Sequence, residues 1–126
     1  MNELLRFELP FLPQSVNKLY LRSRTGIYIN PKAIDFKDKV HQLLNTLIFN
    51  KSSNKIKLII TFQVKKKNID CDNLLKLMLD AMNKIVFDDD SQVYEIHARK
   101  IISKEIKTIV NVFEILNEQM FQITFD

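Results

Sequence analysis

The chain has 126 residues, of which 46% are hydrophobic, and this length and composition predict one domain with a single core. Its single glycine excludes a P-loop or a Rossmann fingerprint, and its single cysteine excludes an intrachain disulfide. A net charge of +4 is compatible with a nucleic-acid partner. Because the chain lacks a signal-peptide pattern and any apolar run of membrane-spanning length, we expect a soluble, cytoplasmic protein.

The N-terminal part of the chain is expected to form short strands joined by a fixed loop. Residues 3–9 alternate loosely between apolar and polar side chains, as a strand does. Two prolines follow, and they favour an extended loop because proline cannot donate to a strand ladder. Two short strands are then predicted at 18–22 and 26–29, joined by a turn in which Gly26 takes a positive φ.

A first helix and the clearest strand come next. Asn30 and Pro31 suit the N-cap and the first helical position, and we expect this helix to end near residue 49. The strand at 55–64 places every second residue on one apolar face: Ile56, Leu58, Ile60, Phe62 and Val64.

A second helix, predicted at 73–86, is apolar almost all round. Its polar side chains, with the residue just before it, follow one line at spacings of four, four and three: Asp72, Lys76, Asp80 and Asn83. A helix this apolar should be buried on most sides, by the sheet and by a partner subunit where one is present.

The last part of the chain predicts two more strands, at 92–101 and 105–116, paired with each other through the turn at 103–104. Residues 117–126 are expected to add a short edge element. The whole chain, 1–126, is therefore predicted to be one α/β (α+β) domain with a mixed sheet and two main helices.

Acidic residues gather at both ends of the second helix. Asp70 and Asp72 lie two residues apart, so in an extended segment their carboxylates point the same way and can share one Mg²⁺. Asp90 lies beyond the far end of a helix about 21 Å long. It can join the other two only if the following strand or loop brings it back. Lys76, one turn past Asp72, can offset charge on a scissile phosphate. This arrangement indicates a divalent-metal site acting on a phosphodiester.

Basic residues precede this site. We expect the lysine run before the acidic pair, with two lysines of the preceding strand, to hold phosphates without reading base sequence. These residues are Lys65, Lys66 and Lys67, with Lys55 and Lys57.

Each of these features also has a purely structural interpretation. Aspartates before a helix commonly cap it, three aspartates in a row are commonly a solvated turn, and a lysine run is commonly a wet strand end. Lys76 can form a surface ion pair with Asp72 or Asp80. We interpret Cys71 as a packing residue and both histidines as ordinary polar residues. The polar line along an otherwise apolar helix favours function.

Two short motifs stand in this sequence in the order that they have in a known protein family. The first is Pro-x-Ser-x-Asn followed by a tyrosine: Pro13, Ser15, Asn17 and Tyr20. The second, more specific, is Asp70, Asp72, Asn73, Lys76 and Asp80, followed by Asp89, Asp90, Ser91, Gln92 and Val93. In these motifs the chain, from about residue 7 to 116, resembles the RusA-type Holliday junction resolvases, small endodeoxyribonucleases of bacteria and their phages. A third aspartate stands where relatives have a hydrophobic residue, so Asp89 remains an alternative to Asp90.

The resemblance implies a homodimeric endonuclease that depends on Mg²⁺, or alternatively Mn²⁺, and resolves four-way junctions by paired nicks in recombination and repair. It implies that Asp70, Asp72 and Asp90 bind the metal and that Lys76 is catalytic. It also places aspartates of both subunits near each other, which would relieve the distance to Asp90. We expect Asn17 and Lys18, with the lysine run, to contact DNA; no membrane or nucleotide cofactor is expected.

Two other functions are compatible with part of these features. A junction- or duplex-binding protein without catalysis would need the lysines and the dimer but no carboxylate cluster. A metal-binding structural domain would need the carboxylates but would have no DNA role.

Overall fold

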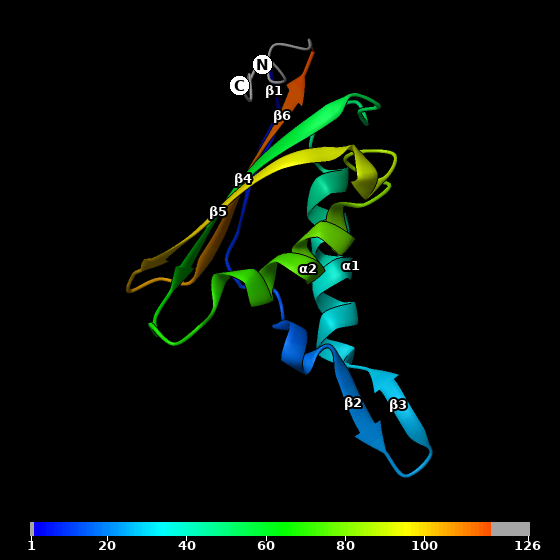
Figure 1. The fold of residues 1–126 in the computed structure, drawn as a ribbon, viewed down its shortest axis with the longest axis vertical. Helices are drawn as coiled ribbons and strands as arrows, with labels where there is room; N and C mark the ends of the chain where they lie inside the picture. The colour runs from blue at the N-terminus through cyan, green and yellow to red at the C-terminus, as the bar shows by residue number, and fades with distance from the viewer. Residues whose placement is uncertain (1, 117–126) are drawn as a thin grey trace, which may run out of the picture.

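Within residues 2–116, which are the residues that the computed structural model describes, a four-stranded mixed sheet carries two α-helices on one face (Figure 1). The sheet consists of β1 (Asn2–Leu9), β4 (Lys55–Val64), β5 (Val93–Ile102) and β6 (Lys107–Ile115). The helices are α1 (Pro31–Asn45) and α2 (Cys71–Met82). This architecture confirms the expected α+β class. The edge element predicted at 117–126 lies outside the described residues.

The strand order, β1-β6-β4-β5, differs from the prediction in one respect. β5 and β6 were expected to pair with each other, and that is wrong: β6 lies between β1 and β4, antiparallel to both. β5 instead pairs with β4 in parallel, because α2 connects them as a crossover. Burial explains which strand takes the inner place. β6 buries alternate residues, whereas β5 carries His97, Arg99 and Lys100 and suits an edge.

The core lies between the sheet and the helices. The predicted inner face of β4 is confirmed, since all five of its apolar side chains are fully buried. α1 turns a stripe at helical spacing toward them: Ala33, Phe36, Val40 and Leu44. α2 contributes Leu74, Leu77, Met78, Ala81 and Met82. Neither described α-helix is long and apolar enough to span a membrane.

Both helices end about four residues earlier than predicted. α1 starts as expected, with the Asn30 side chain accepting a 3.0 Å hydrogen bond from the Lys32 N–H. It ends before Thr46, whose hydroxyl donates to the Leu43 carbonyl at 2.6 Å. α2 ends at Met82 because the next residue is extended and Lys84 has a φ of +68°. The chain then turns so that Val86 and Phe87 are buried in the core rather than continuing the helix.

A β-hairpin projects from the start of α1, away from the sheet (Figure 1). It consists of β2 (Tyr20–Ser23) and β3 (Gly26–Ile29), close to the predicted strands. Gly26 has a φ of +140°, which confirms the predicted positive φ in the turn. β2 starts two residues later than expected because Val16–Lys18 forms a short 3₁₀ turn, η1.

Candidate active site

The two sequence motifs meet in one groove of about 340 Å³ at the N-terminus of α2. From the first motif, Pro13, Ser15 and Asn17 line this groove together with Lys18. From the second motif, Asp70 and Asn73 line its other side. More than fifty residues separate the motifs in the sequence, so only the fold brings them together. The groove therefore joins two expected DNA contacts, Asn17 and Lys18, to one expected metal ligand, Asp70.

Asp70 and Asp72 are exposed and keep their carboxylates largely unengaged. Asp70 occupies the N-cap position of α2 but makes no side-chain capping bond. Its carboxylate accepts a long hydrogen bond, 3.4 Å, from the Asn73 side-chain amide. Across residues 2–116, neither aspartate forms an ion pair. The capping interpretation therefore does not describe Asp70, and the two carboxylates are the hard oxygen donors that a Mg²⁺ site needs.

Lys100, on β5, bonds to the loop that precedes Asp70. Its ammonium group donates hydrogen bonds to the carbonyl oxygens of Lys67, at 2.6 Å, and Ile69, at 2.8 Å. Because Ile69 directly precedes Asp70, these two bonds fix the backbone from which the first carboxylate projects. Sequence reasoning missed Lys100, since a single lysine in a strand gives no local signal of such a contact.

Cys71 lies half-buried between the two aspartates and packs against the core. Burial raises the pKa of its thiol, the neighbouring Asp72 charge raises it further, and the Lys100 ammonium opposes both. The thiol is therefore protonated at neutral pH and is a poor nucleophile. This agrees with its interpretation as a packing residue.

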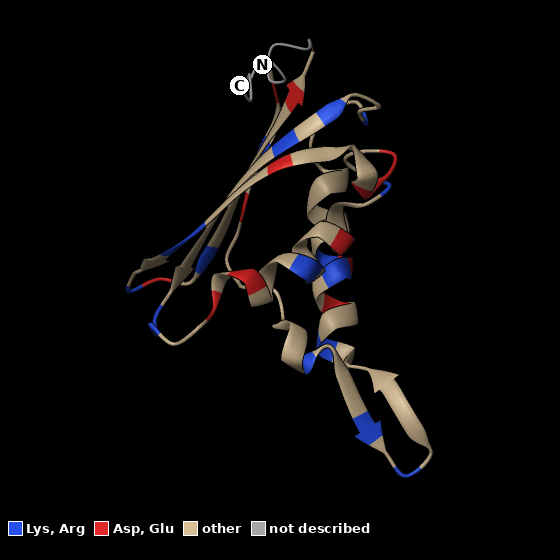
Figure 2. Ribbon diagram, in the orientation of Figure 1, with Lys and Arg blue, Asp and Glu red and all other residues tan. Residues whose placement is uncertain are grey.

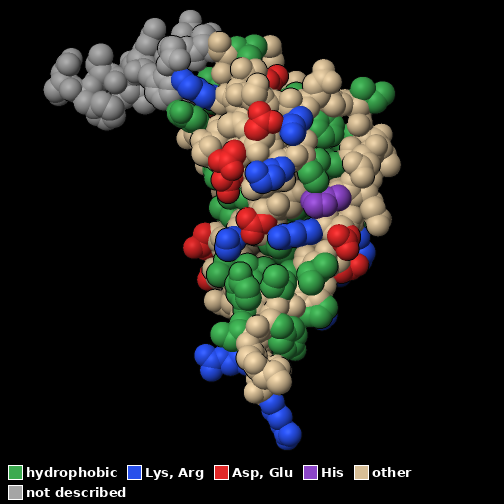
Figure 3. All heavy atoms as spheres, turned by 90° about the vertical axis from the view of Figure 1, so that its right-hand side faces the viewer, with side chains coloured by type: hydrophobic (Ala, Val, Ile, Leu, Met, Phe, Trp, Pro, Cys, Tyr) green, Lys and Arg blue, Asp and Glu red, His purple; other side chains and the backbone are tan. Residues whose placement is uncertain are grey.

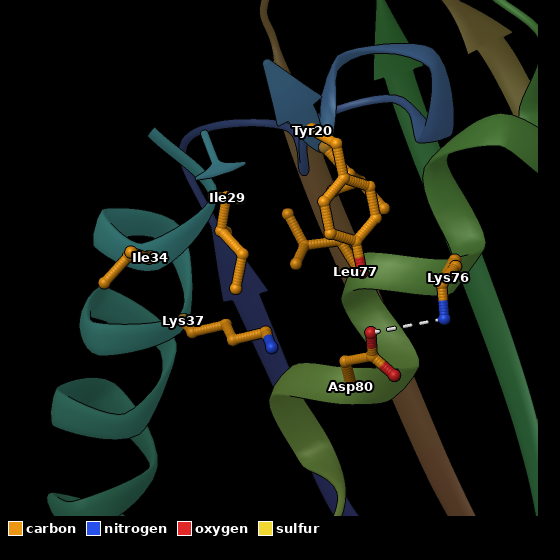
Figure 4. A pocket seen from close by; sticks show the side chains of 9 residues that line it. Tyr20, Ile29, Ile34, Lys37, Lys76, Leu77 and Asp80 are labelled. Atoms are coloured by element: carbon orange, nitrogen blue, oxygen red, sulfur yellow. Dashed lines mark ion pairs between the residues drawn. The ribbon is translucent and has the colours of Figure 1, made fainter. Parts of the chain in front are cut away.

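Lys76 lies on the next turn of α2 and faces Asp80, at 3.7 Å between Nζ and Oδ2 (Figure 4). The pair lines a smaller pocket of about 90 Å³, into which Tyr20 and Ile29 of the hairpin project. More than half of the Lys76 side chain is exposed, at 54%. Such i,i+4 pairs contribute only a few tenths of a kcal/mol, so Lys76 can leave Asp80 for a phosphate at little cost.

In the second acidic cluster, Asp89 has a structural role and Asp90 does not. Asp89 caps a 3₁₀ turn, η2 (Asp90–Gln92): it accepts a hydrogen bond from the Ser91 N–H, and its own N–H donates to the Gln92 side chain. The Gln92 amide donates in turn to the carbonyls of Ser52 and Asn54. Hydrogen bonds from Ser91 lower the pKa of Asp89. The Asp90 carboxylate is exposed and takes no part in this network, so it is the acid that stays available.

Asp90 does not join Asp70 and Asp72 within the chain. No three acidic, histidine or cysteine side chains come together as a metal site anywhere in residues 2–116. The cause is the crossover: α2, twelve residues or about 18 Å long, separates the two clusters. Because β4 and β5 are parallel, η2 stands where β5 begins, and Asp70 follows the opposite end of β4.

The predicted basic contacts are spread over three places. Lys65, Lys66 and Lys67 are exposed on the loop between β4 and α2, below the acidic start of the helix (Figure 2). Lys55 lies over the Tyr94 ring, at 5.3 Å from its centroid. Lys57 is only 19% exposed and lies on the open face of the sheet, 3.9 Å from Glu95. Of these five lysines, only those of the loop directly precede a residue that lines the groove, Asn68.

The histidines are not ligands in this arrangement. The ring Nε2–H of His41 donates to the Ala81 carbonyl near the end of α2, at 3.0 Å, and so joins the two helices. His97 is exposed on β5, with no acidic or cysteine cluster around it in the described part of the chain. Both fit the expectation of ordinary polar residues.

Comparison with known proteins agrees with this picture. No curated protein matches the chain. A family model, Endodeoxyribonuclease RusA, matches residues 10–113, which include both motifs and every residue that lines the groove. That match covers most of the 126 residues, so the chain belongs to the RusA family of endodeoxyribonucleases, the enzymes that resolve Holliday junctions.

Proposed function

We propose that this enzyme cleaves four-way DNA junctions with a divalent metal held by Asp70 and Asp72. One observation carries the proposal: the exposed, unpaired carboxylate of Asp70 lines a groove that both family motifs form, and the equally exposed and unpaired Asp72 lies two residues further on. Bound Mg²⁺ supplies Lewis-acid activation of water and neutralises charge at the scissile phosphate. The N–H groups at the start of α2 favour a phosphate at the same place.

The other residues of the candidate site have separate roles. Lys76, released from Asp80, stabilises the negative charge that develops on the phosphate. Asn17 and Lys18 line the groove beside Asp70 and hold the strand that is cut, while the loop lysines hold flanking phosphates. Lys100 keeps the loop before Asp70 in place through its two carbonyl contacts.

The active form in this proposal is a homodimer in which Asp90 of one protomer completes the site of the other. The separation of the acidic residues supports it: α2 lies between Asp90 and Asp70 of the same protomer, and no third acidic side chain joins Asp70 and Asp72 within residues 2–116. Apolar side chains for an interface are exposed on β5, the last strand of the described sheet: Tyr94, Ile96, Ile101 and Ile102. A two-fold dimer then has two equivalent sites, as paired nicks in symmetric strands require.

The test is cleavage of a synthetic four-way junction beside a linear duplex of the same sequence, in Mg²⁺, Mn²⁺ or EDTA. We expect metal-dependent nicking of the junction, lost in Asp70→Asn. Asp88→Asn is the matched control, because Asp88 is an exposed aspartate paired with Lys51, away from the groove. Junction binding without nicking in either metal would instead identify a binding protein. Equal cleavage by Asp70→Asn and wild type would remove that carboxylate from the site.

A further inference from the structure

Among the described residues, those that hold the β2–β3 hairpin to the body lie at its base. Asn30 makes the attachment, donating its backbone N–H to the Leu19 carbonyl at 2.8 Å and its side-chain amide to the Lys18 carbonyl at 2.7 Å. Beyond this base no residue of either strand is buried. A two-stranded hairpin is at best marginally stable alone in water, so we expect an exposed hairpin of this kind to bind a partner.

The charge on this segment specifies the kind of partner. Residues 10–34 contain four basic residues and no acidic one: Lys18, Arg22, Arg24 and Lys32. They account for the whole net charge of +4, since the rest of the chain carries fifteen basic and fifteen acidic residues. Figure 2 shows blue but no red on the hairpin. Within the described residues, none of the four forms an ion pair. A polyanion is the complementary partner.

The shape and the other side chains of the hairpin indicate which polyanion it binds. One face of the ribbon carries Tyr20 and Arg22 on β2, opposite Ile29 and Ile27 on β3. The exposed fractions are 60% for Tyr20 and 67% for Ile27. In Figure 3 an apolar cluster separates the charged middle of the molecule from the basic hairpin end. The hairpin of a second copy of this chain would carry the same positive charge, so the two hairpins would repel each other. A DNA groove accepts a two-stranded ribbon and attracts arginine.

The hairpin also starts at the candidate active site. Tyr20 and Ile29, at its base, line the small pocket with Lys76 (Figure 4). DNA bound along the ribbon would therefore lead directly to that lysine.

We propose that the hairpin is a DNA-binding arm that lies along a duplex arm of the junction next to the cut, with Arg22 and Arg24 on backbone phosphates. This inference rests on the proposed function for the identity of the substrate. It adds an element that positions the junction from outside the catalytic groove.

The test compares Arg22→Gln/Arg24→Gln with a control that loses the same charge elsewhere, Arg6→Gln/Lys107→Gln. The control residues lie on β1 and β6, on the open face of the sheet, where both pair with Glu8. Binding of a labelled four-way junction is measured by fluorescence anisotropy in EDTA over a salt series, with self-association followed by sedimentation velocity. Arg22 and Arg24 make no side-chain contact that the fold needs, and a thermal melt checks that both variants stay folded.

Each phosphate contact contributes about 0.9 to the slope of log K against log salt. The arm variant should therefore lose about 1.8 from the slope and bind on the order of 50-fold more weakly at 0.1 M salt. An arm variant that matches the control in slope and affinity would overturn the inference, and so would a variant whose main defect is loss of self-association. Failure of the proposed function reads differently: the wild type would bind the junction with the steeper slope yet nick it in no metal.

Discussion

Whether Asp90 acts across a dimer can be decided by combining two inactive variants. In one protomer Asp70→Asn removes a metal ligand, and in the other Asp90→Asn removes the proposed third ligand. If each site takes Asp70 from one protomer and Asp90 from its partner, a heterodimer of the two variants has one site with both defects and one intact site. If each site is built within a protomer, both sites of that heterodimer are broken.

The expected magnitude follows from this count of sites. The heterodimer, co-expressed with two different tags and purified through both, should nick a four-way junction at about half the wild-type rate, because one of two equivalent sites works. It should give single nicks rather than the paired nicks that resolve the junction. Each homodimeric variant alone should be inactive. The separation by α2 is what makes the sharing necessary, since twelve helical residues place about 18 Å between the two clusters.

A control heterodimer pairs Asp70→Asn with Asp88→Asn. It should also show about half the wild-type nicking rate, whether the third ligand comes from the same protomer or from the other, because Asp88 is outside the site. A gel that resolves nicked and fully resolved junctions gives both rates. An inactive Asp70/Asp90 heterodimer beside a half-active control would refute the shared site.

Four further predictions concern single residues. Lys100→Met should weaken Mn²⁺ binding, measured by electron paramagnetic resonance, about tenfold, because the loop before Asp70 loses two hydrogen bonds; an unchanged affinity would contradict its positioning role. Phe62→Ala should cost about 3–5 kcal/mol in urea unfolding at fixed protein concentration, since Phe62 is fully buried. The lowered pKa of Asp89 means that its cap stabilises the fold above the ordinary carboxyl value of 3.8 and is lost as the pH falls further; Asp89→Asn, which still caps, should lack this part of the acid sensitivity in melts from pH 2.5 to 6. Cys71→Ala should keep nicking activity, and the wild-type thiol, whose pKa burial raises, should react slowly with a disulfide reagent at pH 7.

For the two helices, local chemistry predicted the starts better than the ends. Asn30 and Pro31 define the start of α1 by themselves, because an N-cap oxygen and a preset φ act within one turn. The end of α2 depends on Val86 and Phe87, which are buried in the core although they lie outside the helix. In the sequence, Ile85 and Val86 simply extend the apolar pattern of the helix. The pairing of β5 was missed for a similar reason. The short link to β6 suggested a hairpin, but β5 and β6 pair with opposite edges of β4, and the strand with the better apolar face takes the inner position.

The acidic and basic residues of the second motif could be found in the sequence because their spacing is local. The groove between the two motifs, and the Lys100 contacts, depend on tertiary structure and leave no local trace. One structural role was readable in advance: Asp89 and Gln92 have the spacing of a capping box. That spacing identifies Asp89 as the residue that shapes η2 and leaves Asp90 as the candidate for chemistry.

The second motif therefore mixes two kinds of requirement. Asp89, Ser91 and Gln92 bond to one another, and Gln92 also bonds to the chain just before β4, so they fix where the Asp90 side chain leaves the surface. Asp70 and Lys76 make only weak contacts within the protomer, as groups that await a metal and a phosphate should. If the motif served stability alone, its capping members would suffice, and the unengaged carboxylates at the start of α2 would have no purpose. Replacing Asp70 should accordingly change metal binding and cleavage while leaving the melting temperature nearly unchanged, whereas replacing Gln92 should lower the melting temperature first.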